Sequence, residues 1–468
     1  MQKGKKYFVI GLVGFAVLVL GLPITNLIAG LPTSQEVMAL SMTHPGFDEA
    51  KAILATKCAN CHASDSKLPA YSVLPGARGL IEEDIARGRD SLELSEALPL
   101  TAGEKPGEVV LAKTEHVLQE GLMPPRRYLS MHWNGGLSDE EMAALTAWIQ
   151  ETRATNYAAG VDSELSKSVL RPIPPAQELD SGKIALGELL FHDTRLSGDG
   201  TLSCASCHDL NKGGTDQAPV SIGIDGQKGP INSPTVYNSV FNLAQFWDGR
   251  AADLKEQAEG PVENPVEMGA QWDEVVAVLN QDEELKQRML AEYPDGVTKD
   301  TVTDAIAIYE STLVTPNSRF DQYLLGNDDA MTKTEKNGYH LFLASGCAMC
   351  HAGEAMGGLS YERMGRFKDY FLGRGSPTDV DKGRFNVTND AKDLNAFKTP
   401  LLRNIEVTAP YFHDASAATL EEAVAVMAEY QVDKKLNDTQ VAEIAAFLKT
   451  LTGEYKDHLN PQTARLES

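Results

Sequence analysis

The chain has 468 residues, which suits about three domains of ordinary size and is too long for one small domain. Its 66 acidic residues outnumber the 42 basic ones and leave a net charge of -24. This charge argues against nucleic acid or an anionic membrane surface as a partner. It would attract a basic protein, and it equally serves solubility.

The N-terminus has the pattern of a membrane anchor. After Lys3, Lys5 and Lys6, no charged side chain occurs from Tyr7 through Gln35. A membrane-spanning helix needs about 20 mostly apolar residues, and lysines before it favour an N-terminus inside the cytoplasm. A cleaved signal peptide is the alternative, because Leu27-Ile28-Ala29 is a weak cleavage site. We predict an uncleaved single-pass anchor over 1–31 in the inner membrane, with the rest of the chain in the periplasm.

The pattern Cys-x-x-Cys-His occurs three times, at 58–62, 204–208 and 347–351, and uses all six cysteines. It is the attachment signature of a c-type haem, in which two thiols bind the porphyrin and the adjacent imidazole binds the iron. A zinc half-site or a thioredoxin-like pair would not require the histidine. The sequence therefore predicts three covalently bound haems, held by Cys58, Cys61, Cys204, Cys207, Cys347 and Cys350 and ligated by His62, His208 and His351.

Helices are predicted before and after the haem motifs. Residues 47–56 and 332–343 lead into the first and third motifs, and helices at 138–153, 301–313 and 437–448 close the three units, with Ser138 and Glu141 forming a capping box. The Gly- and Pro-rich insertion at 209–296 is expected to be a loop that builds a pocket. We predict a mainly α fold with three tandem c-type cytochrome domains at 32–160, 161–328 and 329–453, followed by a tail at 454–468.

Three stretches of text resemble the bacterial dihaem cytochrome c peroxidases. They read LGELLFHDTRLSGDGTLSCASCHDL, QFWDGRAADLKEQAEGPVENPVEM and TPLLRNIEVTAPYFHDASAATLEEAVAVM, and the resemblance covers about 172–452. The additional N-terminal unit, with its MPPRRY and the text SIGI, resembles the trihaem membrane-bound quinol peroxidases. The resemblance implies reduction of hydrogen peroxide to water with electrons from membrane quinol.

The sixth ligand of each haem decides whether its iron only transfers electrons or binds peroxide. The resemblance implies Met427 as the distal ligand of the third haem. Met123, which precedes Pro124-Pro125, is predicted for the first haem, with Met131, His116 and His132 as competitors.

The middle haem is predicted to lack a sixth protein ligand. Many relatives carry a histidine where this chain has Ile224, and isoleucine cannot bind iron. His192 is the nearest other imidazole in the sequence, and we expect it to pack in an apolar strip.

The resemblance also implies a set of catalytic residues. Glu267 matches the glutamate that moves a proton between the two peroxide oxygens, and Gln257 and Phe246 match other pocket positions. Trp247 matches the tryptophan between two haems, although core packing alone would also explain it. Asn232, Thr408 and Pro410 match a weak, hydrated calcium site.

Three alternatives remain at this stage. In the first, the electron donor is a periplasmic cytochrome c instead of quinol. In the second, the protein is a non-enzymatic multihaem electron-transfer protein. In the third, it oxidises side chains of a partner protein. The resemblance leaves a homodimer open.

Overall fold

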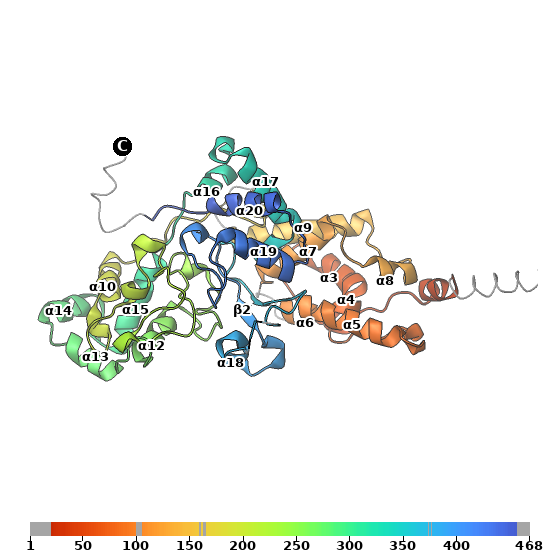
Figure 1. Ribbon diagram of the computed structural model, residues 1–468. Helices are drawn as coiled ribbons and strands as arrows, with labels where there is room; N and C mark the ends of the chain where they lie inside the picture. The colour runs from red at the N-terminus through yellow and green to blue at the C-terminus, as the bar shows by residue number, and fades with distance from the viewer. Residues whose placement is uncertain are drawn as a thin grey trace, which may run out of the picture. The chain divides into compact units, whose positions relative to one another are not determined.

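The computed structural model describes residues 20–99, 105–158, 161, 165–372, 374–375 and 377–455. The predicted anchor falls mainly on residues 1–19, and most of the predicted tail lies after residue 455, so both lie largely outside the described residues. Within the described ranges, no helix is both long enough and apolar enough to cross a bilayer. The chain divides into two compact units, 1–168 and 169–468, and is mainly helical (Figure 1).

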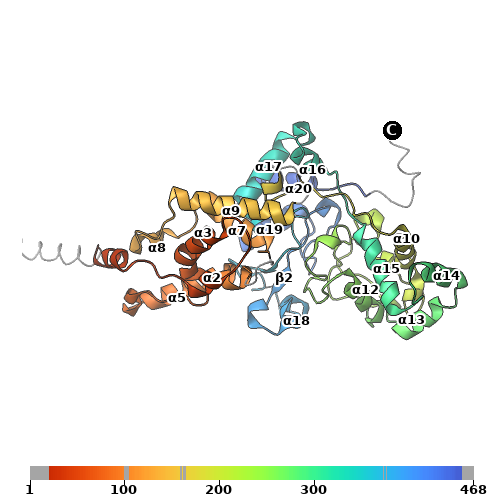
Figure 2. The ribbon, with the colours of Figure 1, turned by 180° about the vertical axis from the view of Figure 1, so that it is seen from behind.

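In the first unit, helices α3 (Phe47–Ile53) and α7 (Glu108–Gln119) both pack on α9 (Asp139–Tyr157), as Figure 2 shows from behind. The capping box of Ser138 and Glu141 that opens α9 confirms the prediction. Arg153 is fully buried and holds α7 through ion pairs with Glu108 at 2.6 Å and Glu115 at 2.9 Å. The other helices of this unit are α2 (Gln35–Ala39), α4 (Ala59–His62), α5 (Ala77–Ser91), α6 (Leu94–Ala97) and α8 (Arg126–Met131).

A π-helical turn at Leu54–Cys58 joins α3 to the first haem motif. The predicted entry helix is therefore present, but its last turn widens, and such turns often occur at functional sites.

The first lobe of the second unit is organised around helices α10 (Ser181–Phe191) and α15 (Lys299–Ser311). These helices approach closely at Gly187, where an added Cβ would lie 2.0 Å from the carbonyl oxygen of Ala305. Glycine is therefore required at this crossing. The remaining helices of the lobe are α11 (Cys204–Cys207), α12 (Leu254–Glu263), α13 (Trp272–Leu279) and α14 (Glu283–Glu292).

The expectation that 209–296 is a loop is only half correct. The chain is irregular as far as Asp253, but α12, α13 and α14 then follow. Trp272, Val275 and Leu279 on α13 are buried in the core of the lobe, so this helix is held mainly by tertiary packing.

The second lobe of this unit packs α17 (Lys333–Ala344) against α20 (Asp438–Lys449). The crossing again needs glycine, because a Cβ at Gly338 would lie 1.9 Å from the carbonyl oxygen of Glu443. A short antiparallel ribbon, β1 (Tyr361–Arg363) and β2 (Ala396–Lys398), pairs Tyr361 with Lys398. The other helices are α16 (Arg319–Leu324), α18 (Phe385–Thr388) and α19 (Leu420–Tyr430).

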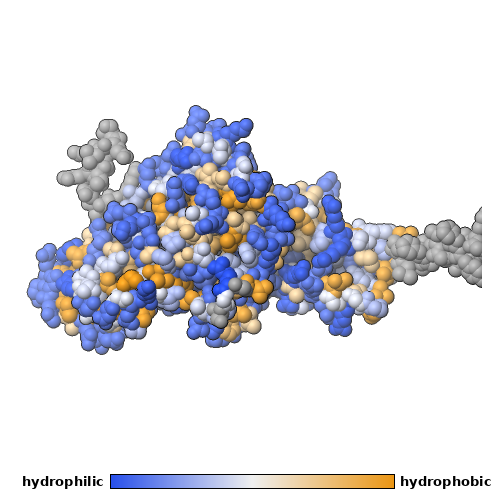
Figure 3. All heavy atoms as spheres, in the orientation of Figure 1, coloured by the Kyte–Doolittle hydropathy of each residue, from blue (hydrophilic) through white to orange (hydrophobic). Residues whose placement is uncertain are grey.

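The face shown in Figure 3 is mostly hydrophilic, with hydrophobic residues in smaller areas between charged ones. This distribution agrees with the high charge of the sequence. The sequence predicts three domains within 32–453, whereas the structure divides into two compact units. The boundary predicted between the second and third domains stays a prediction.

Candidate active site

The second haem motif lies in a cavity of the first lobe. Cys204, Cys207 and His208 line it. The four residues predicted to act in catalysis line the same cavity, although they come from a loop, from α12 and from the turn after α12: Phe246, Trp247, Gln257 and Glu267. The structure therefore brings the whole predicted set together around one imidazole.

The three motif histidines have the same hydrogen-bond arrangement. Nδ1 of His62, His208 and His351 lies 2.9, 3.3 and 3.0 Å from the carbonyl oxygens of Leu92, Gly214 and Met356 respectively. An Nδ1–H donated to a carbonyl fixes the ring and makes Nε2 the nitrogen that can bind a metal, which is the usual arrangement of metal-binding histidines. None of the six cysteines forms a disulfide, and each lies within four residues of its motif histidine. This donor set fits a c-type haem at each motif.

Glu267 lies in the turn that follows α12. Its Oε1 accepts a hydrogen bond from Nδ2 of Asn264 at 2.8 Å. The backbone N–H of Ile224 donates to the carbonyl oxygen of Glu267 at 2.7 Å, so the loop containing Ile224 positions the turn. The loops must approach closely at Gly223, where a Cβ would lie 2.0 Å from the carbonyl oxygen of Val266.

Burial raises the pKa of the Glu267 carboxyl above its usual value, while the nearby Arg250 and the Asn264 hydrogen bond oppose this shift. A raised pKa brings the carboxyl closer to neutral pH, where it can both accept and return a proton.

Ile224 does not line the cavity of His208. A Cβ at Gly269 would lie 3.2 Å from its Cγ2, so its side chain faces Gly269. Among the described residues that line the cavity, His208 is the only histidine. Apart from the motif, the lining side chains with nitrogen or sulfur are Asn232, Gln245, Trp247, Arg250, Gln257 and Met268. The vacant sixth position stays a prediction.

The expectation for His192 is wrong. Its side chain is exposed, and its Nδ1 lies 3.0 Å from the carbonyl oxygen of Glu188. His192 ends α10, and its position at the helix end places the ring in solvent rather than in the apolar core.

Phe246 and Arg250 form the outer side of the cavity. The guanidinium carbon of Arg250 lies 3.5 Å from the centre of the Phe246 ring, and Arg250 also pairs with Asp248 at 3.0 Å. Phe246 has a φ of +67°, a conformation that costs free energy for a side chain of this size.

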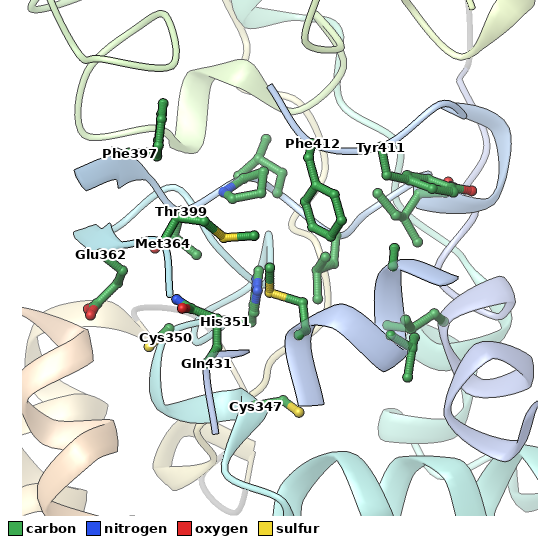
Figure 4. A pocket seen from close by; sticks show the side chains of 18 of the residues that line it. Cys347, Cys350, His351, Glu362, Met364, Phe397, Thr399, Tyr411, Phe412 and Gln431 are labelled. Atoms are coloured by element: carbon green, nitrogen blue, oxygen red, sulfur yellow. The ribbon is translucent and has the colours of Figure 1, made fainter. Parts of the chain in front are cut away.

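A second cavity surrounds the third motif. Cys347, Cys350, His351 and Met427 line it, so the structure places the predicted distal methionine in the cavity of the predicted proximal histidine. In Figure 4, Cys347 and Cys350 lie on either side of His351, and Phe397, Phe412 and Tyr411 surround the space beyond it. His413 lines the same cavity, is buried, and contacts Asp381 at 2.9 Å.

Trp247 belongs to the walls of both cavities, together with Asn232, Ser233, Pro234 and Thr235. Its indole N–H donates to the carbonyl oxygen of Asn232 at 2.8 Å, and its ring meets Phe397 edge-on with centroids 6.5 Å apart. Trp247 is therefore a packed residue that also lies between the two candidate haem sites.

The residues predicted to bind calcium also lie together. Asn232, Thr408 and Pro410 line the second cavity. Nδ2 of Asn232 donates to the carbonyl oxygen of Ala218 at 2.8 Å, which leaves Oδ1 as the atom available to a cation. No group of three His, Cys, Asp or Glu suited to a metal occurs in the part of the chain that the structure describes. Calcium stays a prediction based on amide and carbonyl oxygens.

The residues predicted as possible second iron ligands for the first haem differ in how deeply they are buried. Met123 is 41% exposed, whereas His132 is 7% exposed and stacks on Tyr128 with ring centroids 4.1 Å apart. Met131 and His116 are half-buried. The assignment of Met123 stays a prediction.

Sequence reasoning missed two buried charged residues that line the cavities. Glu310 of α15 is 4% exposed and lines the cavity of His208, and Lys398 of β2 is 6% exposed and lines that of His351. The burial of Glu310 could have been predicted, because this residue follows Ile306 and Tyr309 on the apolar face of a helix. The three-residue strand of Lys398 gives no comparable signal.

These cavities define a multihaem c-type protein in which one candidate site carries acid–base groups. Comparison with known proteins agrees. A model of the di-haem cytochrome c peroxidase family matches residues 181–329, and a haem-binding domain model matches residues 28–151. Cytochrome c peroxidase Ccp of Escherichia coli is 46% identical over 405 residues, which cover 86% of this chain and 87% of that protein.

Cytochrome c551 peroxidase of Nitrosomonas europaea is 49% identical over 295 residues, or 62% of this chain and 86% of that protein. The crystal structure of a MauG-like protein associated with microbial copper homeostasis superposes with a TM-score of 0.54 at 31% identity, covering 60% of this chain and 94% of that one. The chain belongs to the di-haem cytochrome c peroxidase family, and it is a haem peroxidase.

Proposed function

We propose that this chain is a trihaem peroxidase that reduces hydrogen peroxide to water with electrons from a membrane quinol. The observation that carries the proposal is the cavity of His208, in which Glu267, Gln257 and Phe246 lie around a single imidazole among the described lining residues. A site that only transfers electrons would need a second protein ligand for the iron, and it would have no use for a carboxylate in the cavity.

The third haem is proposed for the first unit on two grounds. Its motif has the same Nδ1 arrangement at His62 as the other two motifs. In addition, the match to the Escherichia coli relative is longer than residues 169–468 alone, so it extends into the first unit.

His208, Cys204 and Cys207 would hold a haem here, and its iron would supply the site for peroxide and the redox chemistry. Glu267 accepts the proton of the inner peroxide oxygen and returns it to the outer oxygen, which leaves as water. Asn264 holds Oε1 of Glu267 for this transfer, and burial raises the carboxyl's pKa, which favours return of the proton. Two electrons and two protons per peroxide complete the conversion to two water molecules.

Electrons would reach this site from a haem in the second cavity, which His351 and Met427 would hold. Trp247 is the aromatic residue common to both cavity walls, so we assign it to the route between them. Met123 with His62 completes the chain of electron carriers, and calcium at Asn232, Thr408 and Pro410 stabilises the wall between the cavities.

The quinol donor rests on the anchor proposed at 1–31, which would hold the enzyme in the inner membrane with its catalytic domains in the periplasm. A soluble periplasmic cytochrome c is the second candidate donor. The names of the relatives favour it, and so does the net charge of -24, which would attract a basic protein.

Electron paramagnetic resonance of the oxidised full-length protein tests the peroxidase. We expect a high-spin ferric signal from one haem that changes when peroxide is added, whereas low-spin signals from all three haems would contradict the proposal and favour an electron-transfer protein. Peroxide turnover in membranes with a reduced quinol, compared with turnover on a reduced soluble cytochrome c, then separates the two donors.

A further inference from the structure

Lys398 is a buried cation that the proposed mechanism does not use. It ends β2, and its backbone N–H donates to the carbonyl oxygen of Trp247 at 2.8 Å. Its side chain is 6% exposed and lines the cavity of Cys347, Cys350 and His351. Burial lowers the pKa of its ammonium to about 8, and no neighbouring charge contributes to the shift.

The other charged side chains that line this cavity do not neutralise Lys398. Glu362 is the only carboxylate among the described residues that line it; Arg366 carries the same sign of charge as Lys398, and His413 is bonded to Asp381. The charge of Glu362 makes no contribution to the pKa shift of Lys398, and no ion pair joins the two side chains. A buried ammonium with no counter-ion is costly, and such groups are normally paired or hydrogen-bonded. Lys398 therefore needs an anion that the described residues lining the cavity do not provide.

A c-type haem carries such anions, because its porphyrin bears two propionate groups that ionise to carboxylates. We propose that the ammonium of Lys398 binds a propionate of the haem attached at Cys347 and Cys350, and thereby raises the reduction potential of that haem. The inference rests on the proposed haem at His351 and adds a ligand for its carboxylate.

The expected increase in the reduction potential of this haem follows from charge alone. Reduction adds one negative charge to the haem, and a fixed positive charge nearby stabilises the reduced state. The effect is large only because the ammonium is buried, since an exposed lysine would be screened by solvent and salt. A high potential at this site suits a haem that passes electrons on through Trp247.

The experiment is a redox titration of the full-length haem-loaded protein in three variants, following the absorption and paramagnetic signals of the His351 haem. Lys398→Met keeps the length of the side chain and removes its charge, Lys398→Arg keeps the charge, and Lys435→Met removes a charge from an exposed site as the matched control. We expect Lys398→Met to lower the ratio of reduced to oxidised haem at fixed potential by about tenfold, which is about 59 mV for one electron. The Lys398→Arg variant and the control should both remain close to wild type.

Haem content is measured first in every variant, because it separates the two proposals. A wild-type protein without haem at the third motif would contradict the proposed function. A haem-loaded Lys398→Met protein with an unchanged potential would overturn the inference about Lys398. If Lys398→Met fails to accumulate, Lys398→Gln provides the neutral variant.

A small anion from solvent is the other source of negative charge. Resonance Raman bands of the propionate groups should shift in Lys398→Met but not in the control, and the potential should not depend on phosphate concentration. A phosphate-dependent potential in the wild type with unshifted propionate bands would assign the site to a free anion and overturn the proposal.

Discussion

Replacing Glu267 with glutamine tests the chemical step most directly. Glutamine has nearly the same shape, and its amide oxygen can still accept the hydrogen bond that Asn264 donates at 2.8 Å. The substitution removes the ability to accept and return a proton, together with the negative charge near Arg250. General acid–base catalysis contributes about 10²- to 10⁴-fold, so the rate should fall by that factor, or by about 2.7 to 5.4 kcal/mol of activation free energy.

The assay is stopped-flow mixing of the reduced enzyme with peroxide, which measures the reaction at the iron without the donor. Glu263→Gln is the matched control, because Glu263 is exposed at the end of α12 and does not line the cavity. Haem spectra of both variants should match the wild type before peroxide is added.

The pH dependence gives a second, independent readout. Burial raises the pKa of Glu267, and the first step needs the carboxylate, so the rate should fall as the pH drops through this raised pKa. Arg250 opposes the shift; replacing it with methionine should raise the pKa further and move the acid limb of the profile to higher pH. A Glu267→Gln enzyme that reacts within about fivefold of wild type, with the same acid limb, would refute the role of Glu267 as the proton carrier, since a real proton carrier is worth at least about 10²-fold.

Three further predictions concern the surroundings of this site. Ile224 faces Gly269, so the imidazole introduced by Ile224→His reaches the iron only when this loop turns toward the cavity; we expect that turn to convert the high-spin ferric signal to low spin and to make peroxide turnover dependent on prior reduction, and an unchanged spectrum would show that the loop does not turn. Trp247→Phe keeps an aromatic ring against Phe397 but loses the N–H bond to Asn232, so electron transfer between the two haems should slow in flash-reduction experiments, and an unchanged rate would leave Trp247 a packing role only. Removing calcium with a chelator should lower turnover, with recovery on adding calcium but not magnesium, because the amide and carbonyl donors suit the larger ion; full activity without calcium would exclude the site at Asn232.

Much of the helical framework could be predicted because its signals are local. The capping boxes that begin α9 and α20, and the apolar faces of Trp148 and Ile149 or of Phe447 and Leu448, lie within a few turns of sequence. The helices α12 to α14 were missed because Gly and Pro dominate the preceding loop. The buried face of α13 becomes evident only when the rest of the lobe covers it.

The sequence by itself determined the haem chemistry, because each motif holds its two thiols and its imidazole within five residues, and the ligand atoms need no distant partner to be recognised. Only the tertiary structure decided which polar groups face each cavity. Glu267, Gln257 and His208 are brought together by the fold, His192 is turned into solvent at the end of a helix, and Lys398 is buried by a strand pairing that its own neighbours do not specify. Burial depends on contacts between residues far apart in the chain, and it is burial that raises the pKa of the Glu267 carboxyl and lowers that of the Lys398 ammonium.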